Sequence, residues 1–238
     1  MKKLRVIAVM ASLPLFCGQA MAQDQDVKAP VSGAPRTQPR EKHEMTFFVT
    51  SENPGKGGDL GGLAGADAYC KKLATAVGAG NHDWRAYLST QGPGAVNARD
   101  RIGQGPWYNQ KGVRIAADLA DLHGDTVELA RKGNLINKAT IVTEKGDIVP
   151  GEGDKPNNHD ALTGSQMDGR AWTDSADHTC KNWTSSTDGK AYVGHMDRTS
   201  TGFGGSWNAT HDTQGCSLEA FRKNDGAGLF FCFAADSK

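Results

Sequence analysis

Apolar residues recur along the chain with two spacings, and each spacing predicts a type of element. Residues 46–51 alternate with a period of two, which is typical of a strand. Residues 63–77 carry apolar side chains every three or four positions, which predicts an amphipathic helix that ends at Gly78. Residues 83–89 alternate again and predict a second strand. A short helix and three further strands are expected at residues 117–122, 139–143, 191–194 and 229–233.

These elements predict an α+β domain at residues 45–238. The two helices precede most of the strands instead of alternating with them, which favours an α+β arrangement over α/β. The sequence contains 30 glycines, so we expect extensive loops. Residues 23–44 are polar, contain three prolines and have almost nothing to bury. We therefore predict that residues 23–44 form a flexible tether ahead of the domain.

The first 22 residues have the pattern of a secretory signal peptide. Lys2, Lys3 and Arg5 precede an apolar run that is too short to span a bilayer. Ala20 and Ala22 place small residues at the cleavage-site positions. We expect cleavage after residue 22, no membrane span in the mature chain, and export to the periplasm, the cell surface or the medium.

Charge limits the partners of the mature chain. The predicted signal peptide holds three of the 27 basic residues and none of the 27 acidic ones, which leaves a net charge of −3. A weakly acidic chain has no broad basic surface for nucleic acid or an anionic membrane. We therefore expect neither partner.

Four cysteines remain after removal of the signal peptide, which carries Cys17. An even number in an oxidising compartment predicts two disulfides, for which three pairings are possible. No Cys-x-x-Cys pair occurs, so we interpret the cysteines as structural bridges and not as zinc or redox groups. The four residues are Cys70, Cys180, Cys216 and Cys232.

Six segments, taken in order, resemble the endostatin-type domain and a family of exported bacterial endostatin-like, lectin-type proteins. They are GLAGADAYCKKLATAVG, WRAYLS, PWYNQKG, LTGSQMDGRAW, CKNWTS and GCSLEAFRKNDGAGLFFCFA. The resemblance extends over residues 45–235. It implies a C-type-lectin-like fold, in which a twisted, mostly antiparallel sheet with two helices carries long loops.

The resemblance also implies nested disulfides, with Cys70 bonded to Cys232 and Cys180 bonded to Cys216. The outer bridge would close a loop of about 160 residues, which chain-entropy arguments value at roughly 5 kcal/mol. Such bridges would hold the scaffold while the loops between them carry recognition.

Loops in the C-terminal half combine aromatic rings with amides and carboxylates, as sugar sites do. The candidate ligand-binding residues are Asn182, Trp183, Asp188, Trp207, Asn208, His211 and Asp212. Large aromatic side chains are usually buried. We therefore expect Trp172 and Trp183 in the core and prefer the polar neighbours as ligand contacts, while Trp207 stays open between the two roles.

No cofactor is expected, and the identity of any metal stays open. The calcium motifs of sugar-binding C-type lectins are a Glu-Pro-Asn or Gln-Pro-Asp loop, which is absent, and a Trp-Asn-Asp strand. Here Trp207 and Asn208 are followed by Ala209 where a carboxylate would stand. Calcium would need other carboxylates, with candidates at Asp174, Asp177 and Asp212. The seven histidines are scattered, and we expect most of them to make hydrogen bonds within loops.

The sequence carries no motif of a nucleophile elbow, a zinc protease or a phosphate-binding loop, so we predict that the chain is not an enzyme. The function we predict is carbohydrate binding by an exported, lectin-like protein whose partner is a glycan or glycoconjugate. The first alternative is an adhesin that binds host or matrix proteins outside the cell. The second is a glycan-active hydrolase, which would need two carboxylates roughly 5 to 9 Å apart in a cleft.

Overall fold

The computed structural model describes residues 43–198 and 205–238. The predicted signal peptide (1–22) and nearly all of the predicted tether (23–44) lie outside the described residues. In chain order the elements are β1 (Phe47–Val49), α1 (Gly62–Ala76), β2 (Trp84–Ala86), the 3-10 helix η1 (Ala98–Asp100), β3 (Trp107–Tyr108), β4 (Arg114–Ala116), α2 (Leu119–His123), α3 (Val127–Lys132), β5 (Asp160–Leu162), α4 (Cys180–Trp183), β6 (Tyr192–His195), β7 (His211–Asp212), α5 (Leu218–Arg222) and β8 (Gly226–Ala234).

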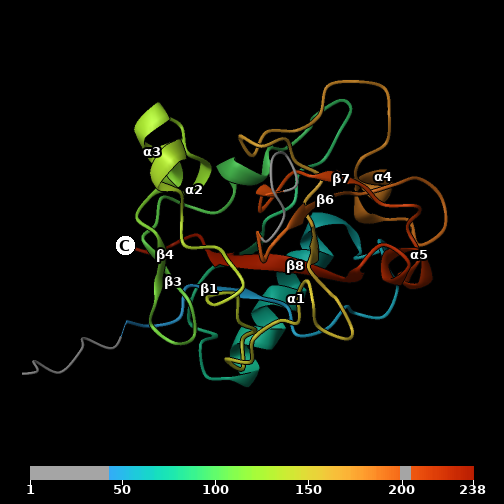
Figure 1. Ribbon diagram of the computed structural model, residues 1–238. Coiled ribbons are helices and arrows are strands. Elements are labelled where there is room, and N and C mark those ends of the chain that lie inside the picture. The colour runs from blue at the N-terminus through green and yellow to red at the C-terminus, as the bar shows by residue number, and fades with distance from the viewer. Residues whose placement is uncertain (1–42, 199–204) are drawn as a thin grey trace, which may run out of the picture. The chain divides into compact units, whose positions relative to one another are not determined.

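A mixed six-stranded sheet organises the domain. The strand order is β1-β8-β5-β6-β7, and β2 also pairs with β8. Strands β5 and β8 run parallel, and the other pairings in the sheet are antiparallel. The long strand β8 crosses the middle of the fold in Figure 1, with β1 beside it. Strands β3 and β4 form a separate antiparallel pair. The domain is therefore α+β, with few helices.

Side chains of β8 alternate between two apolar layers, so this strand is buried on both faces. Phe230 and Cys232 belong to the layer that contains α1. Leu229, Phe231 and Phe233 belong to the opposite layer. A strand that is covered on both sides needs no polar positions, which explains the continuous apolar run at the end of the chain.

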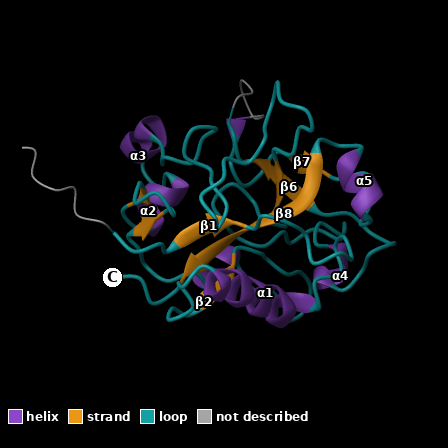
Figure 2. Ribbon diagram, turned by 90° about the horizontal axis from the view of Figure 1, so that it is seen from below, coloured by secondary structure: helices purple, strands orange, loops and turns teal. Residues whose placement is uncertain are grey.

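The first layer is formed by α1 packed against the sheet, and Figure 2 shows this helix running along β2 and β8. Ala66, Cys70 and Leu73 are buried, so the three- and four-residue spacing of the sequence does mark the face that packs. Trp84 of β2 completes the layer, and its Nε1 donates to the carbonyl of Ala79 at 2.8 Å.

The opposite layer is covered by the β3–β4 hairpin and α2. Trp107 and Ile115 come from the hairpin, Leu122 from α2, and Tyr87 and Trp207 from loops. These residues pack on the β1 and β8 side chains of that face. Two apolar layers on one sheet give this loop-rich chain a sizeable core.

The predicted elements are confirmed in part. Helix α2 begins where Asp118 accepts from the Asp121 amide at 2.8 Å, close to the expected short helix. The strand predicted at residues 139–143 is wrong, because Thr140 and Ile141 both donate to the carbonyl of Asn137 and the chain turns there, with isolated bridges at Val142 and Thr143 after the turn. Ile141 and Val142 are nonetheless buried, which is why the pattern resembled a strand.

The two disulfides pair as the family resemblance implied. Cys70 of α1 bonds Cys232 of β8, and Cys180 bonds Cys216, with a Cα–Cα distance of 5.7 Å in each. The bridges are nested and agree with an oxidising compartment outside the cytoplasm. Within residues 43–198 and 205–238, no helix combines the length and the hydropathy that crossing a bilayer requires.

Candidate functional site

Three histidines and one aspartate meet at one edge of the sheet. His159 directly precedes β5, Asp160 begins β5, His195 ends β6, and His211 begins β7. Asp160 and His195 are register partners in the antiparallel β5–β6 pair, so their side chains share a face. His211 pairs with Val193, two residues from His195, and therefore lies on that face as well. We call these four residues the histidine cluster.

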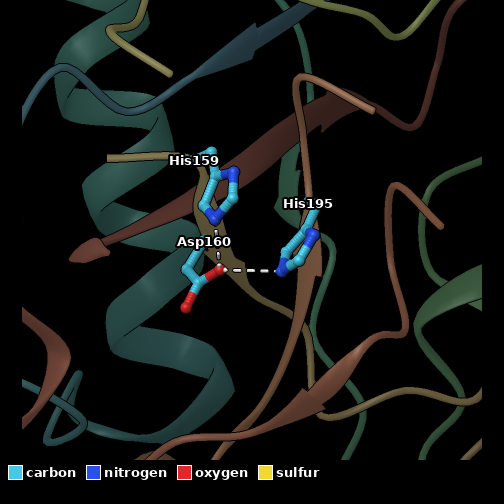
Figure 3. Close-up of side chains that lie close together, drawn as sticks. All are labelled: His159, Asp160 and His195. Carbon is cyan, nitrogen blue, oxygen red and sulfur yellow. Dashed lines mark ion pairs between the residues drawn. The ribbon is translucent and has the colours of Figure 1, made fainter. Parts of the chain in front are cut away.

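One carboxylate oxygen lies at the centre of the histidine cluster. Oδ1 of Asp160 is 3.5 Å from Nε2 of His159, 3.4 Å from Nε2 of His195 and 3.7 Å from Nε2 of His211. Figure 3 shows that one nitrogen of His159 and one of His195 point at this oxygen, and the two rings are stacked with their centroids 4.1 Å apart. The Nε2 atoms of His195 and His211 are 3.0 Å apart.

Burial defines the electrostatics of the histidine cluster. Asp160 is 3% exposed, and burial raises the pKa of its carboxyl to about 6, although His211 and Asn224 favour the ionised form. Nδ1 of His159 lies 3.2 Å from Oδ2 of Asp197, which also accepts from the amide of Glu152 at 2.7 Å. Burial opposes charge on His159, but Asp197 and Asp160 outweigh it and raise its pKa.

The sequence did not predict the histidine cluster. Its members come from three segments, and only His159 and Asp160 are adjacent. None of the local spacings that identify metal sites is present. His211 was a candidate for ligand contact, but the structure places it beside Asp160 and His195. The adjacent His-Asp pair at the start of an apolar strand is the one local sign in the sequence.

A second group of aromatic and polar side chains lies around Trp172. The indole ring of Trp172 lies 4.7 Å from the His178 ring and 4.8 Å from the Tyr192 ring, between centroids. His178 also contacts two carboxylates, Asp174 at 3.2 Å and Asp212 at 2.6 Å. We call these five residues the tryptophan patch.

The carboxylates of the tryptophan patch reach solvent, whereas His178 between them is buried. Asp174 has 53% of its side chain exposed and Asp212 has 33%. Trp172 is half-buried, so the prediction that it belongs to the core is wrong. Its Nε1 is buried and has no acceptor among the described residues. Tyr192 and Asp212 are register partners across β6 and β7, which fixes one side of the patch on the sheet.

The candidates near the second disulfide have structural contacts. Trp183 is fully buried, as expected, and its Nε1 donates to the carbonyl of Ser89 at 2.8 Å. Asn182 is exposed and accepts from the amide of Gln91 at 2.7 Å. Asp188 is 73% exposed and pairs with Lys181 at 3.1 Å. Trp183 therefore offers no surface to a ligand, whereas Asn182 and Asp188 do.

Trp207 and Asn208 line a cleft of about 520 Å³ between the α2–α3 segment and the loop that carries Met167. Trp207 is only 5% exposed and packs on Tyr87 and Phe231. Asn208 is 1% exposed and donates through Nδ2 to the Tyr87 hydroxyl at 2.9 Å. Both residues shape the wall of the cleft from within the core.

The candidate residues therefore do not form one exposed surface. Asn182 and Asp188 lie by α4, Asp212 belongs to the tryptophan patch, and Asn208 is buried. Asp177, one of the carboxylates considered for calcium, accepts from the backbone amides of Thr179 and Lys181.

A comparison with models of known protein families finds no match, and a comparison with curated protein sequences finds none either. The class of protein that the chain represents is accordingly defined by its α+β fold, its two disulfides and the geometry of its sites.

Proposed function

We propose that the chain is an exported, non-catalytic carbohydrate-binding protein and that the tryptophan patch contacts the sugar. The observation that carries the proposal is the pair of half-exposed rings, Trp172 and Tyr192, which lie 4.8 Å apart and are flanked by Asp174 and Asp212.

This combination suits the two kinds of surface on a sugar ring. The C–H groups of one face are apolar and pack on an aromatic ring, whose amphipathic character suits a half-wet site. The hydroxyl groups at the rim are donors, and ionised carboxylates accept such hydrogen bonds strongly. Asp174 and Asp212, which contact His178 from its two ring nitrogens, are the acceptors in this proposal.

The surrounding structure supports a binding role because it holds the patch rigidly. The amide of His178 donates to Oε1 of Gln91 at 2.7 Å, and the amide of Tyr192 donates to the carbonyl of His178 at 2.7 Å. Gln91 is in turn bonded to Asn182. A pre-organised site loses less entropy when a ligand binds.

The proposal also includes the fold family and the export of the chain. The α+β sheet, the nested bridges and the six resembling segments together support a C-type-lectin-like frame of the endostatin-like kind, preceded by a cleaved signal peptide and a tether. Two disulfides support export, since such bridges persist in oxidising compartments.

A glycan array with the disulfide-bonded chain tests the proposal. We expect binding to at least one class of glycan, and we expect Trp172→Ala to weaken that binding at least tenfold, or about 1.4 kcal/mol. The matched control is Met167→Ala, which removes an exposed apolar side chain from the cleft and should bind as the unchanged chain does.

Three outcomes separate the possible functions. Binding that Trp172→Ala abolishes supports the sugar site. Absence of binding to every glycan, with the protein folded, contradicts it. Capture of an extracellular matrix protein that excess free sugar does not displace favours the adhesin.

A further inference from the structure

The histidine cluster contains a buried acceptor that lacks a donor. Oδ1 of Asp160 has less than 1 Å² of accessible surface and no hydrogen-bond partner in the described part of the chain, whereas Oδ2 accepts from Asn224 at 3.1 Å. An unsatisfied buried polar group destabilises the fold, and more so when it is charged. A cation that reaches this oxygen would remove that destabilisation.

One neighbouring group turns a histidine lone pair toward Asp160. The carboxylate of Asp197 can only accept, so Nδ1 of His159 donates to it and leaves the Nε2 lone pair facing Asp160. A carboxylate that holds the far nitrogen of a histidine is the usual second contact of a metal-binding histidine. At His211, Nδ1 lies 3.2 Å from the carbonyl oxygen of Asp212 and 3.3 Å from Nδ2 of Asn224, so both contacts involve the nitrogen that is not next to His195.

Distances within the histidine cluster are close to those between the ligands of one metal ion. Zinc bonds of about 2.0–2.1 Å in a tetrahedron place the ligand atoms about 3.3–3.4 Å apart. Oδ1 of Asp160 lies 3.5 Å from Nε2 of His159 and 3.4 Å from Nε2 of His195, and ligand atoms of these three residues all lie within 4.8 Å of one another. Nε2 of His211 lies beside this group, 3.0 Å from Nε2 of His195 and 3.7 Å from Oδ1 of Asp160. We propose that His159, Asp160 and His195 bind one divalent transition-metal ion of the zinc class and that the His211 side chain moves in to complete the tetrahedron.

The donor set indicates which ions fit. Imidazole nitrogen suits zinc, copper, iron and nickel, whereas calcium and magnesium require oxygen ligands. Two carboxylates would balance the charge of one divalent ion: Asp160 as a ligand, and Asp197 through its hydrogen bond with His159. The ion and these two carboxylates together would carry no net charge. Zinc fits best because it accepts tetrahedral nitrogen and oxygen ligands and has no redox chemistry in an oxidising compartment.

The role of the ion is structural. Four protein ligands fill a tetrahedron and leave no open position for a substrate. Three of the ligands are buried, and only His211, with 37% of its side chain exposed, gives access from solvent. The ion would tie the two-residue strand β7 to β5 and β6, so it acts as a third cross-link beside the two disulfides.

Metal titration of the chain, purified with both disulfides formed and stripped with a chelator, tests the site. We expect one Zn²⁺ per chain by calorimetry and a rise in melting temperature on binding. We also expect Co²⁺ to give the intense visible absorption of a four-coordinate complex. Asp160→Asn keeps the size of the side chain but removes the anionic ligand, and should weaken Zn²⁺ binding at least a hundredfold.

His211→Ala provides an independent test, because this residue is half-exposed and its loss leaves the core intact. It should weaken Zn²⁺ at least tenfold and abolish the cobalt spectrum. The matched control is His43→Ala, which removes a histidine that stacks on Tyr108 outside the cluster and should leave zinc binding unchanged.

The alternative is a metal-free network in which a protonated histidine satisfies Asp160. In that case the folded chain takes up no Zn²⁺, or binds it equally well as Asp160→Asn, and either result overturns the proposal. Binding that is lost in His43→Ala but retained in His211→Ala overturns it too.

Discussion

Asp160 lies opposite His195 in the antiparallel pairing of β5 and β6, and Oδ1 of Asp160 is 3.4 Å from Nε2 of His195. This relationship depends on the sheet, because the two residues are far apart in the chain. Pairing of β7 with β6 then adds His211 to the same face. The histidine cluster is thus a product of strand register, and shifting any of the three strands by one residue would disperse it.

Removing a bound metal should loosen β7 more than the rest of the sheet. The amides of Thr210 and Thr213 flank this strand and donate to the carbonyls of Val193 and Ala191. We expect both amides to exchange with deuterium at least tenfold faster after chelation, since local opening controls exchange at such sites. Hydrogen-exchange mass spectrometry or NMR measures the change.

The control for this prediction is the amide of Tyr87, which donates to Phe231 of β8 at 2.9 Å, away from the cluster. Its exchange should not change on chelation. Equal acceleration at Tyr87 and Thr210 would mean that the whole domain is destabilised, and an unchanged rate at Thr210 would show that no ion ties β7 to its neighbours.

The two disulfides should differ in the stability that they contribute. Cys70–Cys232 spans 162 residues and Cys180–Cys216 spans 36. The chain-entropy relation values these bridges at about 5 and about 4 kcal/mol. All four sulfurs are fully buried, so the losses of packing are similar. We expect Cys70→Ala/Cys232→Ala to lower the free energy of unfolding by about 1 kcal/mol more than Cys180→Ala/Cys216→Ala.

Urea unfolding of the two double variants measures this difference. Fully reduced protein provides the reference in which neither bridge contributes. If the variant without the shorter bridge is the less stable one, strain or local packing near α4 outweighs loop length, and the entropic ordering is wrong.

The spacing of apolar residues predicted the elements that bury one face or both faces. It failed where contacts between distant residues determine the local structure. The spacing in α1 and the apolar run in β8 identify both elements because each buries a continuous face. Strands β3, β5 and β7 have only two or three residues, too few for a period to show. Residues 139–143 have the apolar content of a strand but turn, because three-dimensional packing overrides local pattern.

The candidate site could be predicted only in fragments for the same reason. Asp212 and His211 were identified beside Trp207, yet they belong to two different groups, the tryptophan patch and the histidine cluster. Adjacent residues in a strand face opposite sides of a sheet. Only the fold could show that Trp172 joins Asp212 and that His159 joins His195.

Trp183 and Trp172 should respond differently to truncation. Trp183 is fully buried and hydrogen-bonded to Ser89, so Trp183→Ala should destabilise the fold by about 3–5 kcal/mol. Trp172 is half-buried, and Trp172→Ala should cost less than half of that. Thermal or urea unfolding compares them directly. Equal losses would place Trp172 in the core and would remove the tryptophan patch as a ligand surface.

His123 should make the fold sensitive to acid. Burial lowers the pKa of its imidazole to about 4, and the nearby guanidinium of Arg99 acts in the same direction. Asp125 and Asp168 oppose the shift without reversing it. Nδ1 of His123 lies 2.9 Å from the carbonyl of Leu119, so it donates there, and Nε2 accepts from the hydroxyl of Tyr87.

An unfolded histidine titrates near 6.5. Below that pH the unfolded chain takes up a proton that folded His123 does not accept until about pH 4. The stability that this residue contributes is therefore complete above pH 6.5 and is lost as the pH falls toward 4, by about 3 kcal/mol.

The variant His123→Gln cannot titrate at this position. The amount by which its free energy of unfolding falls below that of the unchanged chain should therefore shrink by about 3 kcal/mol between pH 6.5 and pH 4. Urea unfolding between pH 7 and pH 4, with chelator present to exclude metal release, measures this difference. A difference that stays constant with pH would show that folded His123 accepts its proton as readily as the unfolded residue does.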